Sequence, residues 1–251
     1  MSFNPIGDGA AYPLTSCFHH MSALRCLQVE SCDLTDRFLD DHISPVLKRR
    51  RLEDLRIGFN EFTCSSLKSW MHVLDFSCLK YLSLQGLSND RLVSILCSSI
   101  QTVGGCQLIE LELSHCNLTD SCVEKLVFAL EYTPDLKKLF LKNNIRLGID
   151  SVAALLTFCR TKCVHIEELN FFGCALTQSD TKDNERCVES LRSFLEWSKS
   201  LQKLSFSFNR QHNDPTWIPS LSDVWITGHD NGGIVKQPTE YQLILSTPSC
   251  S

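Results

Sequence analysis

The chain repeats one pattern of apolar residues seven times, and this repeat restricts its possible folds more than any other feature. The units start at Leu24, Leu52, Leu79, Leu108, Leu136, Ile166 and Leu201. Successive starts are separated by 28, 27, 29, 28, 30 and 35 residues. A strand and helix of this combined length cannot cover their own apolar faces, so the units must stack on one another in a single array.

Each unit follows the template L-x-x-L-x-L-x-x-(N or C)-x-L, whose middle L-x-L predicts a strand. Alternate side chains of a strand point to opposite faces, so Leu111 and Leu113 are expected to face the core while their neighbours face out. The chain turns at the ninth position, where a short polar side chain can bond backbone groups of the adjacent turns. That position is occupied by Cys32, Asn60, Leu87, Cys116, Asn144, Cys174 and Asn209.

An amphipathic stretch follows the strand and predicts a helix. In residues 118–130 apolar side chains recur every four residues, with Thr119 near the start and Pro134 beyond the end. Residues 34–51 and 147–159 show comparable patterns. We therefore expect strands and helices to alternate along the array.

The pattern resembles the ribonuclease-inhibitor type of leucine-rich repeat, most clearly over residues 106–177. In that family, units of 28 and 29 residues alternate and their turns alternate between Cys and Asn. The resemblance implies an α/β fold: a curved leucine-rich-repeat solenoid with a parallel inner β-sheet, outer helices and about seven repeats of 27–35 residues. It also implies a protein that binds other proteins.

Three segments are predicted: an amino-terminal segment or partial cap (1–23), the repeats (24–209), and a carboxy-terminal cap with a β-hairpin and tail (210–251). Leu87 predicts an irregular third turn, and the polar residues 177–185 predict a long loop in the sixth unit. The hairpin is expected around the sequence DNGG at residues 230–233. Whether the chain is complete or part of a longer protein stays open.

The 14 Cys residues are interpreted as small buried side chains that fill space between units. The first thirty residues carry no secretory signal and no segment has the length of a membrane span, so we expect a reducing compartment. The sequence has no catalytic, cofactor-binding or metal-binding motif, and the chain is predicted not to be an enzyme. A Cys-dependent enzyme is the remote alternative.

A formal net charge of −5 argues against nucleic acid and anionic membranes as partners. The basic run Lys48–Arg51 ends a predicted helix, where positive charge complements the helix dipole, although a nuclear import signal stays open. The expected location is the cytoplasm, with the nucleus as the alternative.

Function is expected on the outward face of the strands, the concave face of the solenoid. We predict a non-enzymatic interaction module or adaptor, monomeric outside its complex, that binds a partner protein. The alternatives are a substrate-recognition subunit that contacts ubiquitin ligase components, and a piece of an innate immune receptor or of a ribonuclease-inhibitor-like protein. The predicted partner-binding residues are Arg56, Tyr81, Glu110, Glu112, Phe140, Lys142, Asn170 and Phe172.

Overall fold

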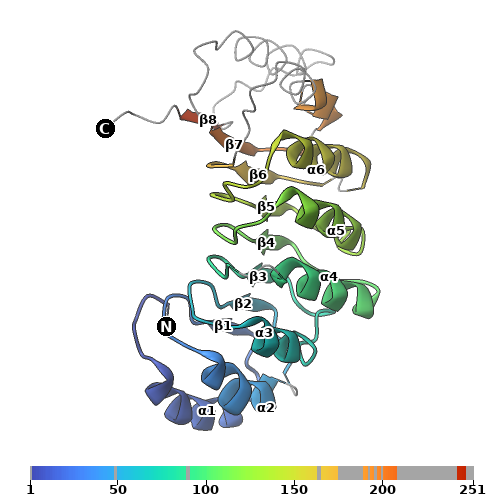
Figure 1. Ribbon diagram of the computed structural model, residues 1–251. Helices are drawn as coiled ribbons and strands as arrows, with labels where there is room; N and C mark the ends of the chain where they lie inside the picture. Colours follow the sequence, from blue (N-terminus) through green and yellow to red (C-terminus); the bar gives the residue numbers. More distant parts are fainter. Residues whose placement is uncertain are drawn as a thin grey trace, which may run out of the picture.

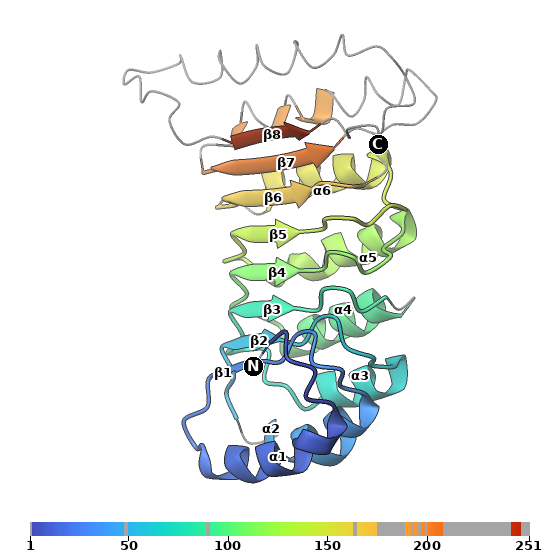
Figure 2. The same ribbon diagram turned by 90° about the vertical axis from the view of Figure 1, so that its left-hand side faces the viewer.

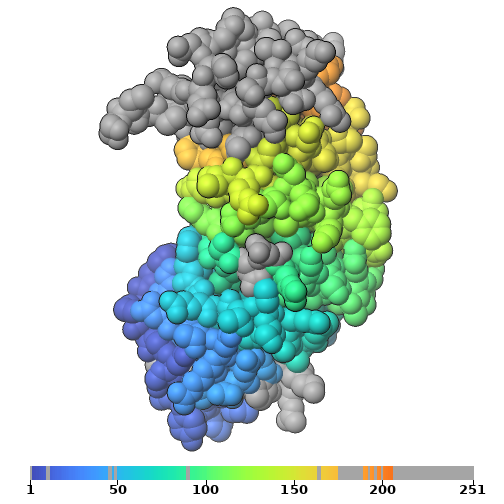
Figure 3. Space-filling view, in the orientation of Figure 1, coloured from blue at the N-terminus to red at the C-terminus, as the bar shows by residue number. Residues whose placement is uncertain are grey.

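The structure is a computed structural model. It describes residues 2–47, 50–88, 91–162, 165–174, 189–191, 193–194, 197–198, 200–207 and 242–246. Within these ranges the chain forms one stack of strand and helix units, with the sheet along one side and the helices along the other (Figures 1 and 2). The space-filling view shows each unit packed directly on the next (Figure 3).

The sheet has eight parallel strands in chain order. The third, fourth and fifth positions of every unit form its strand, and equivalent positions pair, so Leu82, Leu111 and Leu139 lie in one row. The repeat pattern therefore predicted the strand register. The strands are β1 (Cys26–Gln28), β2 (Asp54–Arg56), β3 (Tyr81–Ser83), β4 (Glu110–Glu112), β5 (Lys138–Phe140), β6 (Glu168–Phe171), β7 (Lys203–Ser207) and β8 (Gln242–Ser246).

Helices connect the strands on the opposite side of the core (Figure 2). The amphipathic stretch at residues 118–130 forms α5 (Asp120–Leu130) after the extended Thr119, as expected. The stretch after Leu34 differs from a simple α-helix because it begins with six π-helical residues. The helical elements are η1 (Asp8–Ala10), α1 (Ala11–His20), η2 (Phe38–Ile43), α2 (Ser44–Leu47), α3 (Cys64–Met71), α4 (Leu92–Val103), α5 and α6 (Ile149–Thr161).

The core lies between the two layers and runs the length of the stack. The inward strand residues Leu55, Leu82, Leu111 and Leu139 are all buried, as are helix residues such as Leu126. Truncation of one such leucine to alanine costs about 2–5 kcal/mol, because the packed neighbours close the cavity only in part. Burial of apolar side chains between units thus holds the stack together.

The ninth-position asparagines bond the backbone of two adjacent turns. Asn144 Oδ1 accepts the backbone N–H groups of Cys116 and Leu118 at 3.1 and 3.0 Å. Its Nδ2 group donates to the carbonyls of Leu113 and Leu141 at 3.0 and 2.8 Å. One buried amide therefore satisfies four backbone groups, which confirms the role predicted for this position.

The equivalent Asn60 makes the same kind of bonds to the turn of the first unit. Two ninth-position cysteines bond the unit before their own: the thiols of Cys116 and Cys174 donate to the carbonyls of Leu84 and Leu141 at 3.2 and 3.3 Å. Both thiols are buried, and desolvation raises their pKa to about 12. Cysteine thus serves as a packing residue with a weak donor at these turns.

The third turn has Leu87 in place of Asn or Cys, and this side chain is buried. Its backbone nevertheless follows the other turns, because Gly86 is left-handed and donates its N–H to the Ser114 carbonyl of the next unit. The predicted irregularity of this turn is therefore confined to the side chain at residue 87, while the backbone bond to the next unit is kept. Residues 89–90 of this unit, and the predicted loop at 177–185, lie outside the described residues.

Residues 2–20 form the turn and helix half of a further unit, which the apolar repeat did not predict. Phe3 donates its backbone N–H to the Glu30 carbonyl. One unit later, the equivalent Ser31 donates its backbone N–H to the Gly58 carbonyl. Asp8 accepts bonds from the backbone N–H and the hydroxyl of Thr35. The equivalent Asp36, 28 residues later, accepts the same two bonds from Thr63. The helix expected in residues 1–23 is α1, and its Phe18 is buried.

The basic run at 48–51 is described only at its last two residues. Arg50 donates to the carbonyls of Phe18 and His19 at 3.3 and 3.2 Å, at the end of α1, where a cation complements the helix dipole. Lys48 and Arg49 lie outside the described residues.

At the other end, β8 extends the sheet by pairing with β7 in parallel. The predicted hairpin turn at 230–233 and the run before it lie outside the described residues, so the hairpin stays a prediction. In the described part of the chain, no helix is long and apolar enough to cross a membrane.

Candidate protein-binding face

The side chains at the third, fifth and seventh positions of the units point away from the core, and we call this surface the open face. The strand register places equivalent side chains in continuous rows across the sheet. The third-position row is Cys26, Asp54, Tyr81, Glu110, Lys138, Glu168 and Lys203. The fifth-position row is Gln28, Arg56, Ser83, Glu112, Phe140, Asn170 and Ser205.

A network of polar contacts crosses the open face from β1 to β5. Gln28 donates to Asp54 at 2.8 Å, and Asp54 pairs with the Arg56 guanidinium at 3.1 Å. Arg56 also reaches Glu110 at 3.4 Å, and Lys138 lies 3.8 Å from the same carboxylate. Burial lowers the pKa of Arg56, but the carboxylates of Asp54 and Glu110 outweigh it and raise the pKa overall. Arg56 is therefore held in place as a cation between two strands.

Glu112 lies beside this network but has no cation partner among the described residues. Its Oε1 accepts the Ser114 backbone N–H at 2.7 Å. Burial raises the pKa of Glu112, and the nearby Glu110 and Glu30 carboxylates add to the shift. Glu30 in turn accepts a 2.7 Å bond from the Ser83 hydroxyl. A positive charge placed beside Glu112 would therefore stabilise its ionised form.

The carboxy-terminal part of the open face carries a different set of groups. The Lys142 ammonium lies 5.8 Å from the centre of the Phe172 ring, within the range of a cation–π contact. Asn170 Oδ1 accepts the Phe172 backbone N–H at 3.0 Å, and Lys203 pairs with Glu168 at 2.6 Å. These contacts fix the side chains of three neighbouring strands.

Charge divides the open face into two parts. Over the first four units it carries four carboxylates, Glu30, Asp54, Glu110 and Glu112, against the single cation Arg56. Over the next three units the balance reverses, with three lysines against one carboxylate: Lys138, Lys142, Lys203 and Glu168. The net formal charge is therefore negative at one end and positive at the other.

The aromatic side chains of the open face are less exposed than expected. Tyr81, Phe140 and Phe172 lie on the outward face, where solvent exposure is expected, but each side chain is partly buried. Among the described residues, larger exposed apolar surface occurs at Phe59, at the eighth position of the second unit (42% exposed). It also occurs on the outer helix α5 and in the fifth turn, at Phe128 and Ile145.

The eighth positions form a ridge along the edge of the open face. Each eighth-position residue that the structure describes has a positive φ, and two of them are glycines, Gly86 and Gly173. A Cβ on Gly86 would lie 2.2 Å from the Phe59 ring, so glycine lets that ring pass over it to His115, 5.7 Å away between centroids. His115 also bonds Asn143 at 2.9 Å. The contact between Phe59 and His115 was not predicted, because the residue at the eighth position varies from unit to unit.

The structure brings seven of the eight predicted binding residues into small groups. Arg56 forms an ion pair with Glu110, and Lys142 forms a cation–π contact with Phe172. Phe140 lies in register between Glu112 and Asn170. Tyr81 occupies the row position between Asp54 and Glu110. The connecting residues Asp54 and Lys138 were missing from the predicted set, and the shared register of the third-position row is the signal that identifies them. The grouped residues are Arg56, Glu110, Lys142, Phe172, Phe140, Glu112 and Asn170.

The sequence can now be compared with known proteins. A family model described as "Leucine Rich repeat" matches residues 106–127. The ribonuclease inhibitor of Mus musculus is 30% identical over 171 residues, which cover 68% of this chain and 35% of that protein. The chain is a leucine-rich-repeat protein of the ribonuclease-inhibitor-like type.

Other relatives carry longer chains. A Tonsoku-like protein of Danio rerio is 26% identical over 260 residues, 99% of this leucine-rich-repeat chain and 17% of its own length. The human NACHT, LRR and PYD domains-containing protein 14 is 26% identical over 207 residues, 82% of this chain and 16% of its own length. The chain thus spans between about a sixth and a third of the relatives it matches.

Proposed function

We propose that this leucine-rich-repeat chain is a non-enzymatic module that binds a partner protein on its open face. The observation that carries the proposal is the charge division of that face, negative over the first four units and positive over the next three. Complementary charge guides encounter with a partner and fixes its orientation. The coarse function, a module for protein interaction, accords with the leucine-rich-repeat relatives.

The charge division also defines the partner's chemistry. A Lys- or Arg-bearing segment fits over Glu30, Glu110 and Glu112, and an acidic segment fits over Lys138 and Lys142. Cross-strand contacts already hold many of these side chains, so binding requires little further ordering. Glu112 is the best anchor for a basic group, because a cation beside it offsets the cost of its burial.

Ribonuclease inhibition is the weaker form of this proposal. The name of the mouse relative describes a protein that inhibits ribonuclease. A uniformly basic partner would meet Lys138 and Lys142 near the centre of this open face. A partner of mixed charge suits the surface better than a uniformly basic one.

The test compares two charge reversals on the open face, Glu112→Lys and Lys142→Glu, with Glu124→Lys on the exposed side of α5. Each tagged variant is incubated with cell extract, and the recovered proteins are quantified by mass spectrometry. We expect wild type and Glu124→Lys to recover the same proteins. Each open-face variant should lose them at least about tenfold, since like charges placed across an interface cost several kcal/mol.

Equal recovery by all three variants, with unchanged melting temperatures, would contradict the proposal. Because Glu112 is partly buried, the shape-conserving Glu112→Gln is included for the case in which Glu112→Lys unfolds. The identities of the lost proteins also decide between the finer alternatives, which are an adaptor, a ubiquitin ligase subunit and part of an immune receptor. Imaging of the tagged protein tests our proposal of a cytoplasmic or nuclear location, and light scattering tests the proposed monomer.

A further inference from the structure

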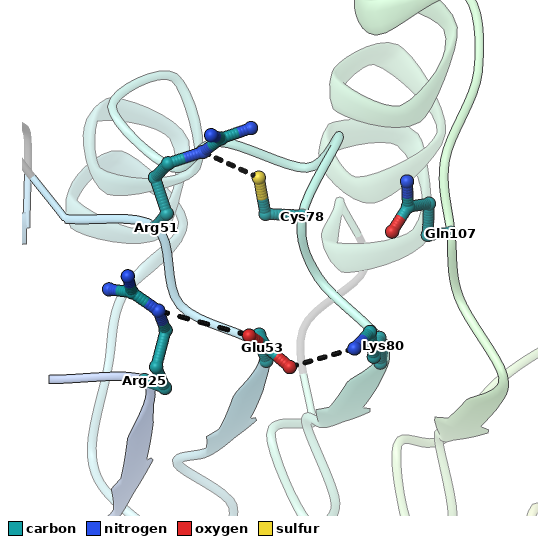
Figure 4. A pocket seen from close by; sticks show the side chains of 6 residues that line it. All are labelled: Arg25, Arg51, Glu53, Cys78, Lys80 and Gln107. Atoms are coloured by element: carbon teal, nitrogen blue, oxygen red, sulfur yellow. Dashed lines mark hydrogen bonds and ion pairs between the residues drawn. The ribbon is translucent and has the colours of Figure 1, made fainter. Parts of the chain in front are cut away.

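A pocket of about 250 Å³ lies at the amino ends of the first strands, outside the open face (Figure 4). Its walls come from the residues just before the units and from the second positions of the units, so it differs from the open face in both place and composition. Three of its six side chains are cationic and one is anionic. The lining residues are Arg25, Arg51, Glu53, Cys78, Lys80 and Gln107.

Cations outnumber carboxylates at this pocket. Glu53 is shared between Lys80 at 2.8 Å and Arg25 at 3.8 Å, so one carboxylate faces two cations. The third cation, Arg51, lies 3.7 Å from Asp75, which sits just outside the lining. One positive charge is left over, and the pocket therefore attracts anions.

Cys78 places a thiol in the wall of this cationic pocket. The Arg51 Nε–H donates to its Sγ at 3.0 Å, as Figure 4 shows, and the thiol donates to Asp75 Oδ2 at 3.5 Å. Within the described ranges, the Nη groups of Arg51 make no hydrogen bond, and 71% of its side chain is exposed. These groups can therefore bind an anionic reagent that approaches the sulfur. By contrast, the thiols of Cys97 and Cys116 are buried.

We propose that the pocket binds small anionic disulfides, of which glutathione disulfide is the common cellular example, and that Cys78 is modified by them. The Cys78 thiol loses its proton to solvent, and its sulfur attacks one sulfur of the bound disulfide. A new bond joins Cys78 Sγ to one glutathione, while the old disulfide bond breaks and the second glutathione leaves as a thiolate. Cys78 is oxidised and the departing glutathione is reduced, so the exchange balances without another oxidant.

Two other thiols of the same chain provide internal references. Cys26 is exposed on β1 beside a carboxylate, and desolvation together with Asp54 raises its pKa. Cys17 is exposed on α1. If charge around the thiol selects the reagent, Cys78 prefers an anionic disulfide, Cys26 prefers a cationic one, and Cys17 shows the preference of an ordinary exposed thiol.

The experiment treats the whole chain with glutathione disulfide, which is anionic, or with cystamine, which is cationic. Peptide mass spectrometry gives the modification rate at each cysteine. The expected ratio of the two rates at Cys78 exceeds that at Cys17 by about tenfold, and the ratio at Cys26 lies below that at Cys17. Arg51→Gln and Lys80→Gln should each lower the Cys78 ratio, while the control Lys125→Gln on α5 should leave it unchanged.

Equal ratios at Cys78 and Cys17 would overturn the proposal, as would a Cys78 ratio that survives both pocket substitutions. If a substitution unfolds the chain, the wild-type protein alone decides the question. At about 1 M salt the screening length falls to roughly 3 Å, so the preference of Cys78 must largely disappear. A preference that persists there comes from something other than the pocket's charge. The test is independent of the open face and of any protein partner.

Discussion

Two regions of the molecule carry regular rows of polar groups, and they use them differently. At the turns, Asn60 and Asn144 are buried and bond several backbone groups each. On the open face, Arg56 and Glu110 are only partly buried and bond other side chains. Water cannot replace the buried bonds at the turns, so these bonds contribute to folding. Water can replace the contacts on the open face, so the side chains there stay available to a partner.

The largest expected effect breaks the turn row. Asn144→Ala leaves two N–H groups and two carbonyls without their partner, and we expect the free energy of unfolding to fall by about 3 kcal/mol in urea titrations. Asn170→Ala on the open face is the matched control, because the Asn170 side chain accepts a bond from a single backbone N–H, that of Phe172. We expect the control to lose about 1 kcal/mol. Equal losses at both sites would remove the distinction between the two regions.

The ridge between these regions offers the next test. Gly86→Ala forces a Cβ to within 2.2 Å of the Phe59 ring and also strains a φ of +72°, so we expect a loss of about 2 kcal/mol. Gly104→Ala isolates the second cause, because its φ is +70° but nothing lies within 4 Å of the added Cβ. Its expected loss is about 1 kcal/mol. Thermal or urea unfolding of the two variants measures the difference, which we assign to the clash with Phe59.

That assignment has its own check. In the double variant Phe59→Ala with Gly86→Ala, the clash is absent and only the backbone strain remains. If the loss on Gly86→Ala is unchanged in the Phe59→Ala background, the ring is not its cause.

The same two regions show what the sequence could predict. Strands, register and the bonding of Asn144 followed from the repeat, because a period of about 28 residues returns each side chain to the same environment one unit later. The half-unit at residues 2–20 was not predicted because the template is defined by strand leucines, whereas that segment contributes only a turn and a helix.

The contacts of the open face were harder to predict. The sequence marked Arg56 and Glu110 as outward, but not that they pair with each other, since a pair across strands depends on side-chain rotamers as well as register. The partial burial of Phe140 likewise depends on how the neighbouring rows pack over it. The Cys78 pocket joins three units through residues outside the apolar template, so periodicity gave no sign of it.

A smaller effect is expected from the ion pairs of the open face. Arg56→Met removes the partner of Asp54 and Glu110, and we expect the free energy of unfolding to fall by about 1 kcal/mol at low salt. The loss should shrink as salt is added, because screening already weakens the pair in wild type. Lys125→Met on the exposed side of α5 controls for removal of a cation. A salt-independent loss of several kcal/mol would mean that Arg56 belongs with the structural turn residues.

The smallest effect concerns Glu112 and is expected to stabilise the protein. Because the pKa of Glu112 is raised in the folded state, the folded protein binds this proton more tightly than the unfolded chain does. Its contribution is therefore fully present below the ordinary glutamate pKa of 4.5 and is lost as the pH rises through the raised value. Glu112→Gln does not titrate, so its advantage over wild type should be near zero at acid pH and appear toward neutral pH.

We expect this gain at neutral pH to stay within about 1 kcal/mol, measured by urea unfolding of both proteins across the pH range. Glu124→Gln on α5 is the matched substitution. A destabilised Glu112→Gln at neutral pH would show that the ionised carboxylate serves the fold. A gain in stability combined with weaker partner binding would show that the Glu112 carboxylate serves binding. Its charge then destabilises the free protein, and a cationic partner offsets that cost.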